Sequence, residues 1–474
     1  METLTPDVCV IGGGSGGLTV AATAAAFGVP VVLVEEARLG GDCLYAGCVP
    51  SKSFIAAARH AHAVAQARRF GVSALGVEVD FARVHAHIAE VIAAIAPNDS
   101  KERYRGLGVR LVEGVARFRD ARTVTVADEI EIRARRFVIA TGSSPSLPPI
   151  PGLDAVPYLT NETVFDLTRR PEHLIVIGAG PQGLELAQAL RRLGSAVTVL
   201  DAGPPLARED GECAQIVVDE LAREGIALRA SVEVLRVQSM NAKLNAVIRD
   251  ADGEQTISGT HLLVAAGRRA NVGGLGLEQA GIACSGAGIV VGKNLRTTNR
   301  RVYAIGDVAG GSQFTHLANY HAGLVIRNAL FRLPVRANAD GVPRVTFTDP
   351  ELAHVGLSES EAARRGRKVR VLRWPYHEND RARAERDGRG HIKVITSRAG
   401  RVLGATIVGA SAGELITTWT LAVARGMHIG ALAGMIVPYP TLAEVGKRAA
   451  MTYFTPSLTS PFVRRMIGWL RRLG

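Results

Sequence analysis

The sequence has few of the residues on which secreted, membrane-spanning and nucleic-acid-binding proteins depend. Its 474 residues include five cysteines, and a number that is both small and odd argues against a scaffold held together by disulfides. The net charge is +12, but the excess is scattered arginine with no basic block of five, so we expect no nucleic acid as a partner. The apolar stretch 426–443 is interrupted by Gly430, Gly434, Pro438 and Pro440, which favours a buried segment over a membrane span.

The first residues also lack the basic segment of a signal peptide and lead directly into an apolar run. Together with the low cysteine count, this predicts a cytoplasmic, reducing location. In such a compartment, a close pair of cysteines is typical of redox chemistry or metal binding rather than of a structural bond.

A glycine-rich turn occurs twice, each time between an apolar run and a helical segment. The first copy follows the run 8–11, and a second run ends in Glu35. The other copy follows the run 174–177, and its second run ends in Asp201. In both copies the acid lies 23 residues after the first glycine, from 12 to 35 and from 178 to 201. Each copy therefore predicts a βαβ unit that binds a dinucleotide.

In such a unit the glycines let the backbone approach a pyrophosphate at the helix N-terminus, and the acid binds ribose hydroxyls. The binding residues predicted for the first dinucleotide are Gly12, Gly14, Gly17 and Glu35, and those for the second are Gly178, Gly180, Gly183 and Asp201. The carboxylate of Asp201 accepts bonds from a free 2′-hydroxyl and repels a 2′-phosphate, so NADH is favoured over NADPH. Arg208 keeps NADPH open as the alternative.

Cys43 and Cys48 form the most informative pair. Two cysteines five residues apart cannot bridge within one continuous helix, because a disulfide needs Cα atoms within about 7 Å. Gly47 supplies a turn and Pro50 suits a first helical turn, which predicts Cys48 at a helix N-terminus. There the helix dipole and Lys52 favour the thiolate. A zinc site and a pair of inert cysteines are the alternatives. No second Cys/His pair has ligand spacing, so we assign no metal site.

The stretch 40–52, GGDCLYAGCVPSK, resembles the active-site motif of class I pyridine nucleotide–disulfide oxidoreductases, in particular mercuric reductase-like and dihydrolipoamide dehydrogenase-like flavoproteins. The likeness extends to the segments 140–142, 267–268, 305–307 and 347–351. It implies an α/β fold with two Rossmann-like domains, one for FAD and one for NAD(P), and a C-terminal α+β dimerisation domain. It also implies a homodimer whose subunits share the active site.

The resemblance also implies a role for individual residues. Cys48 is expected against the flavin as the charge-transfer thiol and Cys43 as the interchange thiol, with Lys52 near flavin N5 and paired with Glu185. The further residues expected to bind the cofactors are Gly41, Ala116, Thr141, Gly142, Gly267, Asp307 and Thr315. The expected division of the chain is an FAD-binding segment 1–150, an NAD(P)-binding domain 151–271, a return of the FAD domain 272–340, a dimerisation domain 341–455 and a basic tail 456–474.

The sequence departs from the family at three places. Tyr439 stands where the His-Pro-Thr-x-x-Glu motif has its acid/base histidine, and Glu444 closes that motif. No cysteine follows Cys284, so the C-terminal thiol pair of mercuric reductase is missing. Asp42 replaces the usual threonine before the first cysteine, for a reason that the sequence does not give.

The expected function is an FAD-dependent oxidoreductase. Electrons would pass from NAD(P)H through flavin to Cys43–Cys48, and then to a small-molecule disulfide or a thiol-bound metal ion. A phenol with a pKa near 10 is a poor base at neutral pH, so Tyr439 argues against lipoamide or glutathione turnover. The alternatives are an NAD(P)H:quinone or diaphorase-type flavoenzyme and a non-catalytic redox-sensing flavoprotein.

The C-terminal stretch 462–474 has four arginines and no acid, so it is predicted to form a short basic amphipathic helix. Weak contact with a membrane surface is one use of such a helix. The sequence favours a solvated or dimer-docked helix instead, because about a dozen residues bind lipid weakly.

Overall fold

The computed structural model describes residues 1–240, 243–338, 340–458 and 460–473 of an α/β chain. Its internal contacts divide the chain into two compact units. The first unit consists of Met1–Gly178, Ala189–Ala202 and Val232–Ala337, and the second of Ala179–Gln188, Gly203–Ser231 and Asn338–Gly474. Within the described part of the chain, no helix combines the length and the apolar character that crossing a bilayer requires.

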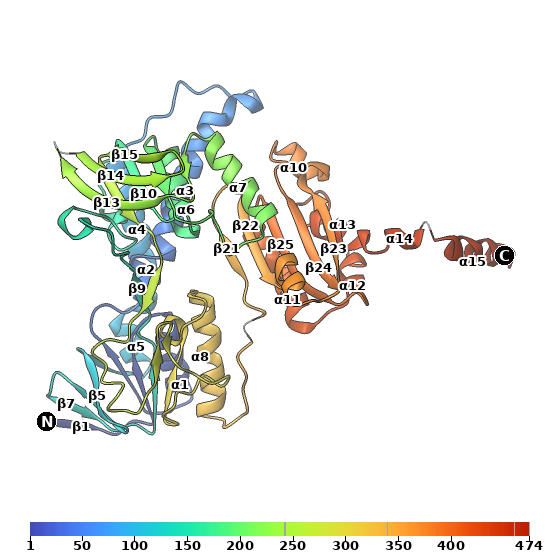
Figure 1. Ribbon diagram of the computed structural model, residues 1–474. Helices are drawn as coiled ribbons and strands as arrows, with labels where there is room; N and C mark the ends of the chain where they lie inside the picture. The colour runs from blue at the N-terminus through green and yellow to red at the C-terminus, as the bar shows by residue number, and fades with distance from the viewer. Residues whose placement is uncertain (241–242, 339, 459, 474) are drawn as a thin grey trace. The chain divides into compact units, whose positions relative to one another are not determined.

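The first unit is built on a five-stranded parallel sheet with the order β20-β8-β2-β3-β4. Its strands are β2 (Val8–Ile11), β3 (Val31–Glu35), β4 (Arg110–Glu113), β8 (Arg136–Ile139) and β20 (Val302–Ala304). Side chains alternate between its two faces. Val8, Val10 and Leu33 pack in the cluster that includes α1 (Ser15–Ala26) and α8 (Thr315–Ala329), two helices that lie side by side (Figure 1).

The opposite face of this sheet packs against a second, smaller sheet. Cys9, Ile11 and Val34 share a buried cluster with Phe118 and Ile132 of that sheet. The small sheet has the order β1-β7-β6-β5, formed by β1 (Glu2–Leu4), β5 (Ala116–Asp120), β6 (Thr123–Val126) and β7 (Ile130–Ile132). Both faces of the parallel sheet are therefore covered, which explains its nearly continuous apolar strands.

The second glycine turn also follows a strand of a parallel sheet. β10 (His173–Ile177) pairs in parallel with β11 (Ala196–Leu200) and with β16 (His261–Val264). An antiparallel sheet formed by β13 (Glu233–Met240), β14 (Lys243–Asp250) and β15 (Gly253–Gly259) packs through Val237, Ala246 and Ile248 in the same core cluster as Ile175. The remaining strands that precede residue 300 are β9 (Ser143–Pro145), β12 (Ala227–Arg229), β17 (Arg268–Ala270), β18 (Cys284–Ser285) and β19 (Gly288–Ile289).

The second unit contains a five-stranded antiparallel sheet with the order β21-β22-β25-β24-β23 (Figure 1). Its strands are β21 (Arg344–Thr346), β22 (Glu351–Gly356), β23 (Val369–Pro375), β24 (His391–Ser397) and β25 (Val402–Gly409). One face packs against α11 (Ala412–Arg425), α12 (Ile429–Ala433) and α13 (Glu444–Thr452). Ile392 and Val394 point to that face, whereas Lys393 points to the other, where α7 (Gly211–Arg223) lies against β22 and β25.

Nine further α-helices occur in the described residues. They are α2 (Gly41–Tyr45), α3 (Cys48–Gln66), α4 (Phe81–Ile95), α5 (Lys101–Gly106), α6 (Pro181–Arg192), α9 (Glu359–Arg364), α10 (Asp380–Ala384), α14 (Thr455–Leu458) and α15 (Pro461–Leu470).

Candidate active site

The two cysteines lie on consecutive helices with a glycine between them. Cys43 belongs to α2, and Cys48 is the first residue of α3, which confirms the predicted position at a helix N-terminus. A Cβ atom at Gly47 would lie 2.9 Å from Asp42 Oδ2 and 3.0 Å from the Asp42 carbonyl oxygen. Only glycine therefore fits the tight break that turns the two cysteines toward each other.

The two thiols have opposite acidities. The hydrogen bond that the Cys43 thiol donates to Cys48 is the main cause that lowers the pKa of Cys48 to about 6, and Thr315 and the charge of Lys52 act in the same direction. The Sγ of Cys48 lies 3.4 Å from the Thr315 Oγ1. The same bond to Cys48, together with burial, raises the pKa of Cys43. In the reduced pair Cys48 is thus the thiolate and Cys43 holds the proton.

Asp42 connects the cysteine loop to a polar network that sequence reasoning missed. Its Oδ2 lies 3.3 Å from Arg268 Nη2, and its Oδ1 accepts a bond of 3.2 Å from Asn161 Nδ2. Arg268 in turn donates to the hydroxyl and the carbonyl oxygen of Ser143, at 2.8 and 2.7 Å. The Ser143 hydroxyl donates to Asp307 Oδ2 at 2.6 Å. Asp42 therefore holds Arg268, which accounts for the carboxylate at the position where the family has threonine.

Two of these missed residues had a signal in the sequence. Ser143 follows the segment 140–142, and Arg268 belongs to the segment 267–268, both of which carry the family resemblance. Asn161 lies in a stretch without a motif, so only the folded chain brings it to Asp42.

The first glycine turn fits a dinucleotide. A Cβ at Gly12 would lie 2.5 Å from the Ala140 carbonyl oxygen, and one at Gly17 would lie 1.9 Å from the Gly12 carbonyl oxygen. A Cβ at Gly14, at the N-cap of α1, would meet open space. The turn is thus packed tightly on its inner side and open at the helix N-terminus, where a pyrophosphate binds in this type of fold.

Two carboxylates flank the first turn. Glu35 ends β3, and its oxygens accept bonds from the backbone N–H groups of Gly13 and Ala37. Asp307 is half-buried, and burial raises its pKa despite the bond from Ser143. Asp307 and Glu35 are therefore available for the polar groups of an FAD molecule, and the residues present fit that cofactor.

The other residues expected around FAD occupy backbone positions close to this turn. Thr141 Oγ1 donates to the Asn271 carbonyl oxygen at 2.8 Å, and the Asn271 N–H donates to the Gly142 carbonyl oxygen at 3.0 Å. Gly41 lies against Gly14, since a Cβ on it would come within 2.8 Å of the Gly14 Cα. Ala116 is buried at the start of β5, and Gly267 adopts a φ of +119° after β16.

The second turn repeats this geometry. A Cβ at Gly178 would lie 2.4 Å from the Ala265 carbonyl oxygen, and one at Gly180 would meet open space. Gly183 lies in α6, and Asp201 directly follows β11. Glu185 is buried and accepts a bond of 2.9 Å from the Phe347 N–H. Because Lys52 and Glu185 belong to different units, their expected pairing stays a prediction.

Tyr439 lies in an exposed loop of the second unit. Its side chain is 70% exposed, and its hydroxyl donates a bond of 2.8 Å to Asp380 Oδ2. This bond and the charge of Asp380 raise the pKa of Tyr439, and Glu444 in the first turn of α13 acts in the same direction. A phenol so placed gives up its proton less readily than a free tyrosine, so less of it is ionised and able to act as a base at neutral pH.

Two of the other cysteines, Cys9 and Cys213, are buried. Cys9 is fully buried in β2, as expected of a small core residue, and burial raises its pKa. Cys213 has a neighbour that the sequence did not reveal, since its Sγ lies 3.6 Å from His391 Nε2. In the described residues, no group of three or more His, Cys, Asp and Glu side chains is placed to hold a metal ion.

Comparison with known proteins identifies the class. Residues 6–322 match the family described as pyridine nucleotide-disulphide oxidoreductase, and residues 342–450 match the dimerisation domain of that family. The chain therefore belongs to the pyridine nucleotide-disulphide oxidoreductases, as the resemblance of its cysteine motif implied. It is a flavoprotein oxidoreductase with the α/β fold expected from its sequence, and its family depends on FAD and a pyridine nucleotide.

Its relatives include enzymes of two activities. A mercuric reductase from Streptomyces lividans is 36% identical over 454 residues, covering 94% of this chain and 96% of the relative. A dihydrolipoyl dehydrogenase from Thermus scotoductus is 36% identical over 458 residues, covering 93% and 95%. Among solved structures, the HOCl-induced flavoprotein disulfide reductase RclA from Escherichia coli, in a Cu(II) complex, superposes with a TM-score of 0.85 at 26% identity, covering 94% of this chain and 99% of that chain.

Proposed function

We propose that this protein is an FAD-dependent reductase that passes electrons from NADH to the Cys43–Cys48 pair and from there to a thiol-binding metal ion. The observation that carries the proposal is the geometry of the pair, since Cys48 begins α3 with its Sγ 3.4 Å from Thr315 Oγ1 and Cys43 lies on the preceding helix α2. This arrangement favours a thiolate at Cys48. A small disulfide is the second acceptor class that such a pair serves.

The replacement of histidine by Tyr439 favours the metal ion. Reduction of a disulfide substrate releases a thiolate that needs a proton, and a general acid/base speeds that transfer by about 10²–10⁴-fold. Tyr439 is a poor group for this step, because its proton is held by Asp380. A soft metal ion binds to thiolates and leaves without such a proton transfer, so it does not need the histidine.

A bound FAD, held at the first glycine turn by residues that include Glu35 and Asp307, would supply the flavin chemistry that links the nicotinamide to the Cys43–Cys48 disulfide. The chain's own residues then control the protons and the acceptor. Reduction of the disulfide takes up two electrons and one proton, which remains on Cys43, while Cys48 stays ionised beside Thr315 and Lys52. A divalent ion that binds both sulfurs displaces the remaining proton from Cys43.

The electrons balance for two kinds of metal substrate. The pair returns to the disulfide when two electrons reduce one Hg(II) to Hg(0) or two Cu(II) to two Cu(I). The mercuric reductase relatives and the Cu(II) complex of RclA support these two ions as candidates.

We further propose NADH as the donor. Asp201 directly follows β11, at the position where a carboxylate binds the adenosine ribose. Replacing Asp201 with Ser should raise the ratio of kcat/KM for NADPH over NADH, and the measurement is steady-state kinetics with both nucleotides. An unchanged ratio would contradict this assignment.

The active unit is proposed to be a homodimer in which Tyr439 and Glu444 meet the cysteine pair of the other subunit. The dimerisation domain of the family supports this arrangement. The loop around Tyr439 also exposes Ile436, which is 94% exposed, as expected of a surface that a second copy covers.

The test is an acceptor screen on purified protein with NADH, covering Hg(II), Cu(II), lipoamide, glutathione disulfide and a quinone. We expect rapid reduction of a metal ion by the unmodified protein, and we expect this activity to be lost in both Cys43→Ser and Cys48→Ser. We also expect a long-wavelength thiolate-to-flavin absorbance, which should be lost only when Cys48 is replaced. Cys284→Ser serves as the matched control, because Cys284 is exposed and lies outside the site. Quinone reduction that survives loss of both cysteines, with no metal reduction, would overturn the proposal.

A further inference from the structure

The C-terminal tail extends beyond the part of the chain that matches the family. The dimerisation-domain match ends at residue 450, and α14 and α15 follow it. From Met451 to Gly474, beyond that match, the sequence has four basic residues, Arg464, Arg465, Arg471 and Arg472, and no acid. The tail is thus a strongly basic addition whose role the proposed electron transfer does not explain.

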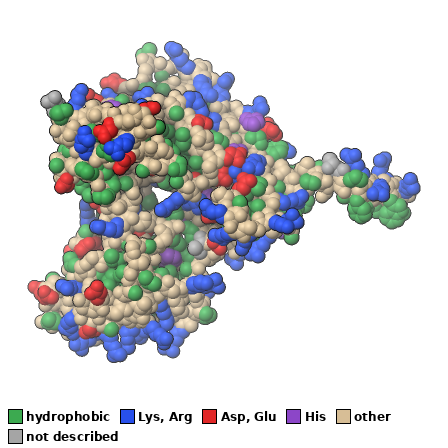
Figure 2. All heavy atoms as spheres, viewed as in Figure 1, with side chains coloured by type: hydrophobic (Ala, Val, Ile, Leu, Met, Phe, Trp, Pro, Cys, Tyr) green, Lys and Arg blue, Asp and Glu red, His purple; other side chains and the backbone are tan. Residues whose placement is uncertain are grey.

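The helix α15 separates its side chains into two sides. At 3.6 residues per turn, each residue is rotated about 100° from the previous one. The residues within one arc of about 160° are all apolar, namely Phe462, Val463, Met466, Ile467, Trp469, Leu470 and Leu473. The arginines share the rest of the circumference with Gly468, and Figure 2 shows the hydrophobic and the basic side chains of this helix on opposite sides.

The apolar side of α15 is open to water. Phe462 is 70% exposed, Trp469 60% and Leu473 67%, and no residue of α15 is buried. Burial of this much aromatic and aliphatic surface is favourable wherever an apolar medium is available. The tail therefore presents a preformed amphipathic surface, and none of the described residues covers its apolar side.

The pattern of charge indicates which kind of partner binds the apolar side of α15. Viewed along the helix axis, Arg471 is the next residue beyond Ile467 at one edge of the apolar arc, and Arg465 is the next residue beyond Trp469 at the other edge. Arginines therefore border both edges of the arc. An arginine at the edge of such an arc lets its aliphatic stem lie in the apolar layer while its guanidinium reaches phosphate groups.

We propose that α15 is a membrane-surface helix that docks the protein on an anionic bilayer, with its axis in the plane of the headgroups. The aromatic and aliphatic side enters the acyl boundary, and the four arginines bind the anionic headgroups. The length of ten residues suits a helix that lies on a bilayer rather than one that crosses it. The geometry thus favours the lipid contact over the solvated or dimer-docked helix that the sequence favoured.

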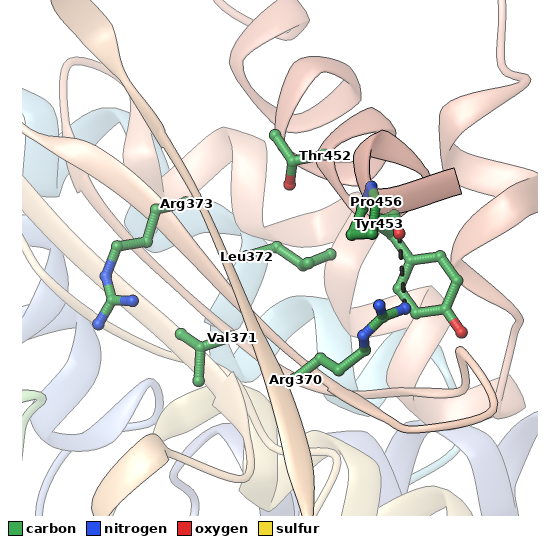
Figure 3. A pocket seen from close by; sticks show the side chains of 7 residues that line it. All are labelled: Arg370, Val371, Leu372, Arg373, Thr452, Tyr453 and Pro456. Carbon is green, nitrogen blue, oxygen red and sulfur yellow. Dashed lines mark hydrogen bonds between the residues drawn. The ribbon is translucent and has the colours of Figure 1, made fainter. Parts of the chain in front are cut away.

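The residues just before the tail are held to the rest of the second unit by contacts of Tyr453. The Tyr453 hydroxyl donates a bond of 2.8 Å to the Arg398 carbonyl oxygen, and the Arg370 guanidinium lies 4.4 Å from the centre of the Tyr453 ring. These residues border a surface pocket of about 450 Å³ between β23 and the end of α13, shown in Figure 3. The pocket is no headgroup site of its own, because Arg370 covers Tyr453 and Arg373 pairs with Glu212 and Glu359. The lipid-binding groups are thus those of α15.

A single helix of this size binds weakly and reversibly. Each arginine near an anionic surface adds about fivefold to the partition, so binding should fall steeply with added salt. A dimer carries two such tails, and the second binds at high effective concentration once the first is docked.

The test is co-sedimentation of the full-length holoprotein with phosphatidylglycerol-containing vesicles and with pure phosphatidylcholine vesicles. Binding to the anionic vesicles alone is expected, with a blue shift of Trp469 fluorescence that is absent from Trp469→Phe. The variant Phe462→Ser/Ile467→Ser should lose at least tenfold in partition, and Arg464→Gln/Arg471→Gln about 25-fold, which is two arginines at about fivefold each. Leu75→Ser and Arg229→Gln change equally exposed residues outside the tail and are the matched controls.

Two results would overturn the proposal. One is a holoprotein that stays in the supernatant with anionic vesicles at low salt. The other is a chain shortened after Ser457 that binds as well as the full-length protein. If removal of the tail splits the dimer while vesicle binding is absent, α15 docks on a second copy of the chain instead. NADH oxidation with soluble acceptors should be the same in all tail variants, so this test is independent of the proposed reaction.

Discussion

At the scale of single residues, the acidity of Cys48 depends on the proton of its neighbour. The hydrogen bond from Cys43 is the largest of the effects that lower the pKa of Cys48 to about 6. Thr315 and Lys52 contribute in the same direction but remain when Cys43 is changed. The thiolate of the reduced pair is therefore present above a pH of about 6 and is lost as the pH falls through that value.

Replacing Cys43 with Ala should raise the pKa of Cys48, because the donor of the main hydrogen bond is gone. The rate of alkylation of Cys48 by iodoacetamide, followed against pH on the reduced protein, measures this pKa. Cys43→Ser is the matched variant, since its hydroxyl still donates and should shift the pKa less. An unchanged midpoint in Cys43→Ala would contradict the assignment of the proton to Cys43.

We expect Tyr439 to influence which acceptors are reduced. Replacing it with His supplies a base of suitable pKa next to Asp380, an acid that can orient the ring. Tyr439→His should therefore raise lipoamide reduction by about 100-fold, at the lower end of general acid–base effects. Metal-ion reduction should change little. Tyr439→Phe is the control, and a rise of the same size in that variant would show that the phenol merely obstructs the site.

At the scale of elements, buried charges hold α7 to the sheet of the second unit. The Lys393 side chain on β24 is 4% exposed and lies 2.9 Å from Asp210 Oδ1, 2.6 Å from Glu212 Oε2 and 3.2 Å from Glu359 Oε2. Asp210 also caps α7 through a bond from the Cys213 N–H. Lys393 thus pairs with two acids at the start of α7, Asp210 and Glu212, and with Glu359 at the start of α9.

Lys393→Met should lower the free energy of unfolding by about 3 kcal/mol, because it leaves the buried carboxylate of Asp210 without its cation. Urea unfolding of the purified protein measures this change. Arg249→Gln removes an exposed partner of Glu233 and Glu254 and should cost less than about 1 kcal/mol. Equal effects of the two substitutions would mean that the Lys393 cluster adds no more than a surface pair.

The same cluster adds a pH dependence. Partial burial opposes the charge of Glu212, but the bonds from Lys393 and Arg373 outweigh it and lower its pKa from the ordinary 4.5 to about 2. Its contribution to stability is therefore complete above pH 4.5 and is lost as the pH falls through about 2. Lys393→Met should flatten this part of the stability profile.

At the scale of the whole molecule, the proposed function requires two chains. Ile436 is 94% exposed in the loop that carries Tyr439, whereas the proposed FAD residues belong to the other compact unit. Ile436→Glu should weaken the dimer and lower acceptor turnover while FAD stays bound. Analytical ultracentrifugation and the flavin content measure these outcomes. Leu75→Glu is the control at an equally exposed leucine, and a dimer of unchanged strength in Ile436→Glu would contradict the placement of the interface.

Local patterns in the sequence predicted the framework of the site. The strands at 8–11 and 174–177, the two glycine turns and the start of a helix at Cys48 each depend on neighbouring residues, and the structure has them there. Steric limits on a tight turn act within a few residues, which is why glycine spacing alone indicates them. The five proposed segments of the chain remain a prediction.

Contacts between distant residues were decided only by the tertiary structure. Asp42, Arg268, Ser143 and Asp307 are separated by up to 265 residues, from 42 to 307, and form one network because strands from separate parts of the chain meet. The neighbours of Cys48 and the burial of Lys393 arise in the same way. Short-range sterics and residue type thus determined the nucleotide turns and the thiol pair, whereas the acidity of each thiol and the partner of each charge required the folded chain, since electrostatic interactions depend on distance in space and on burial.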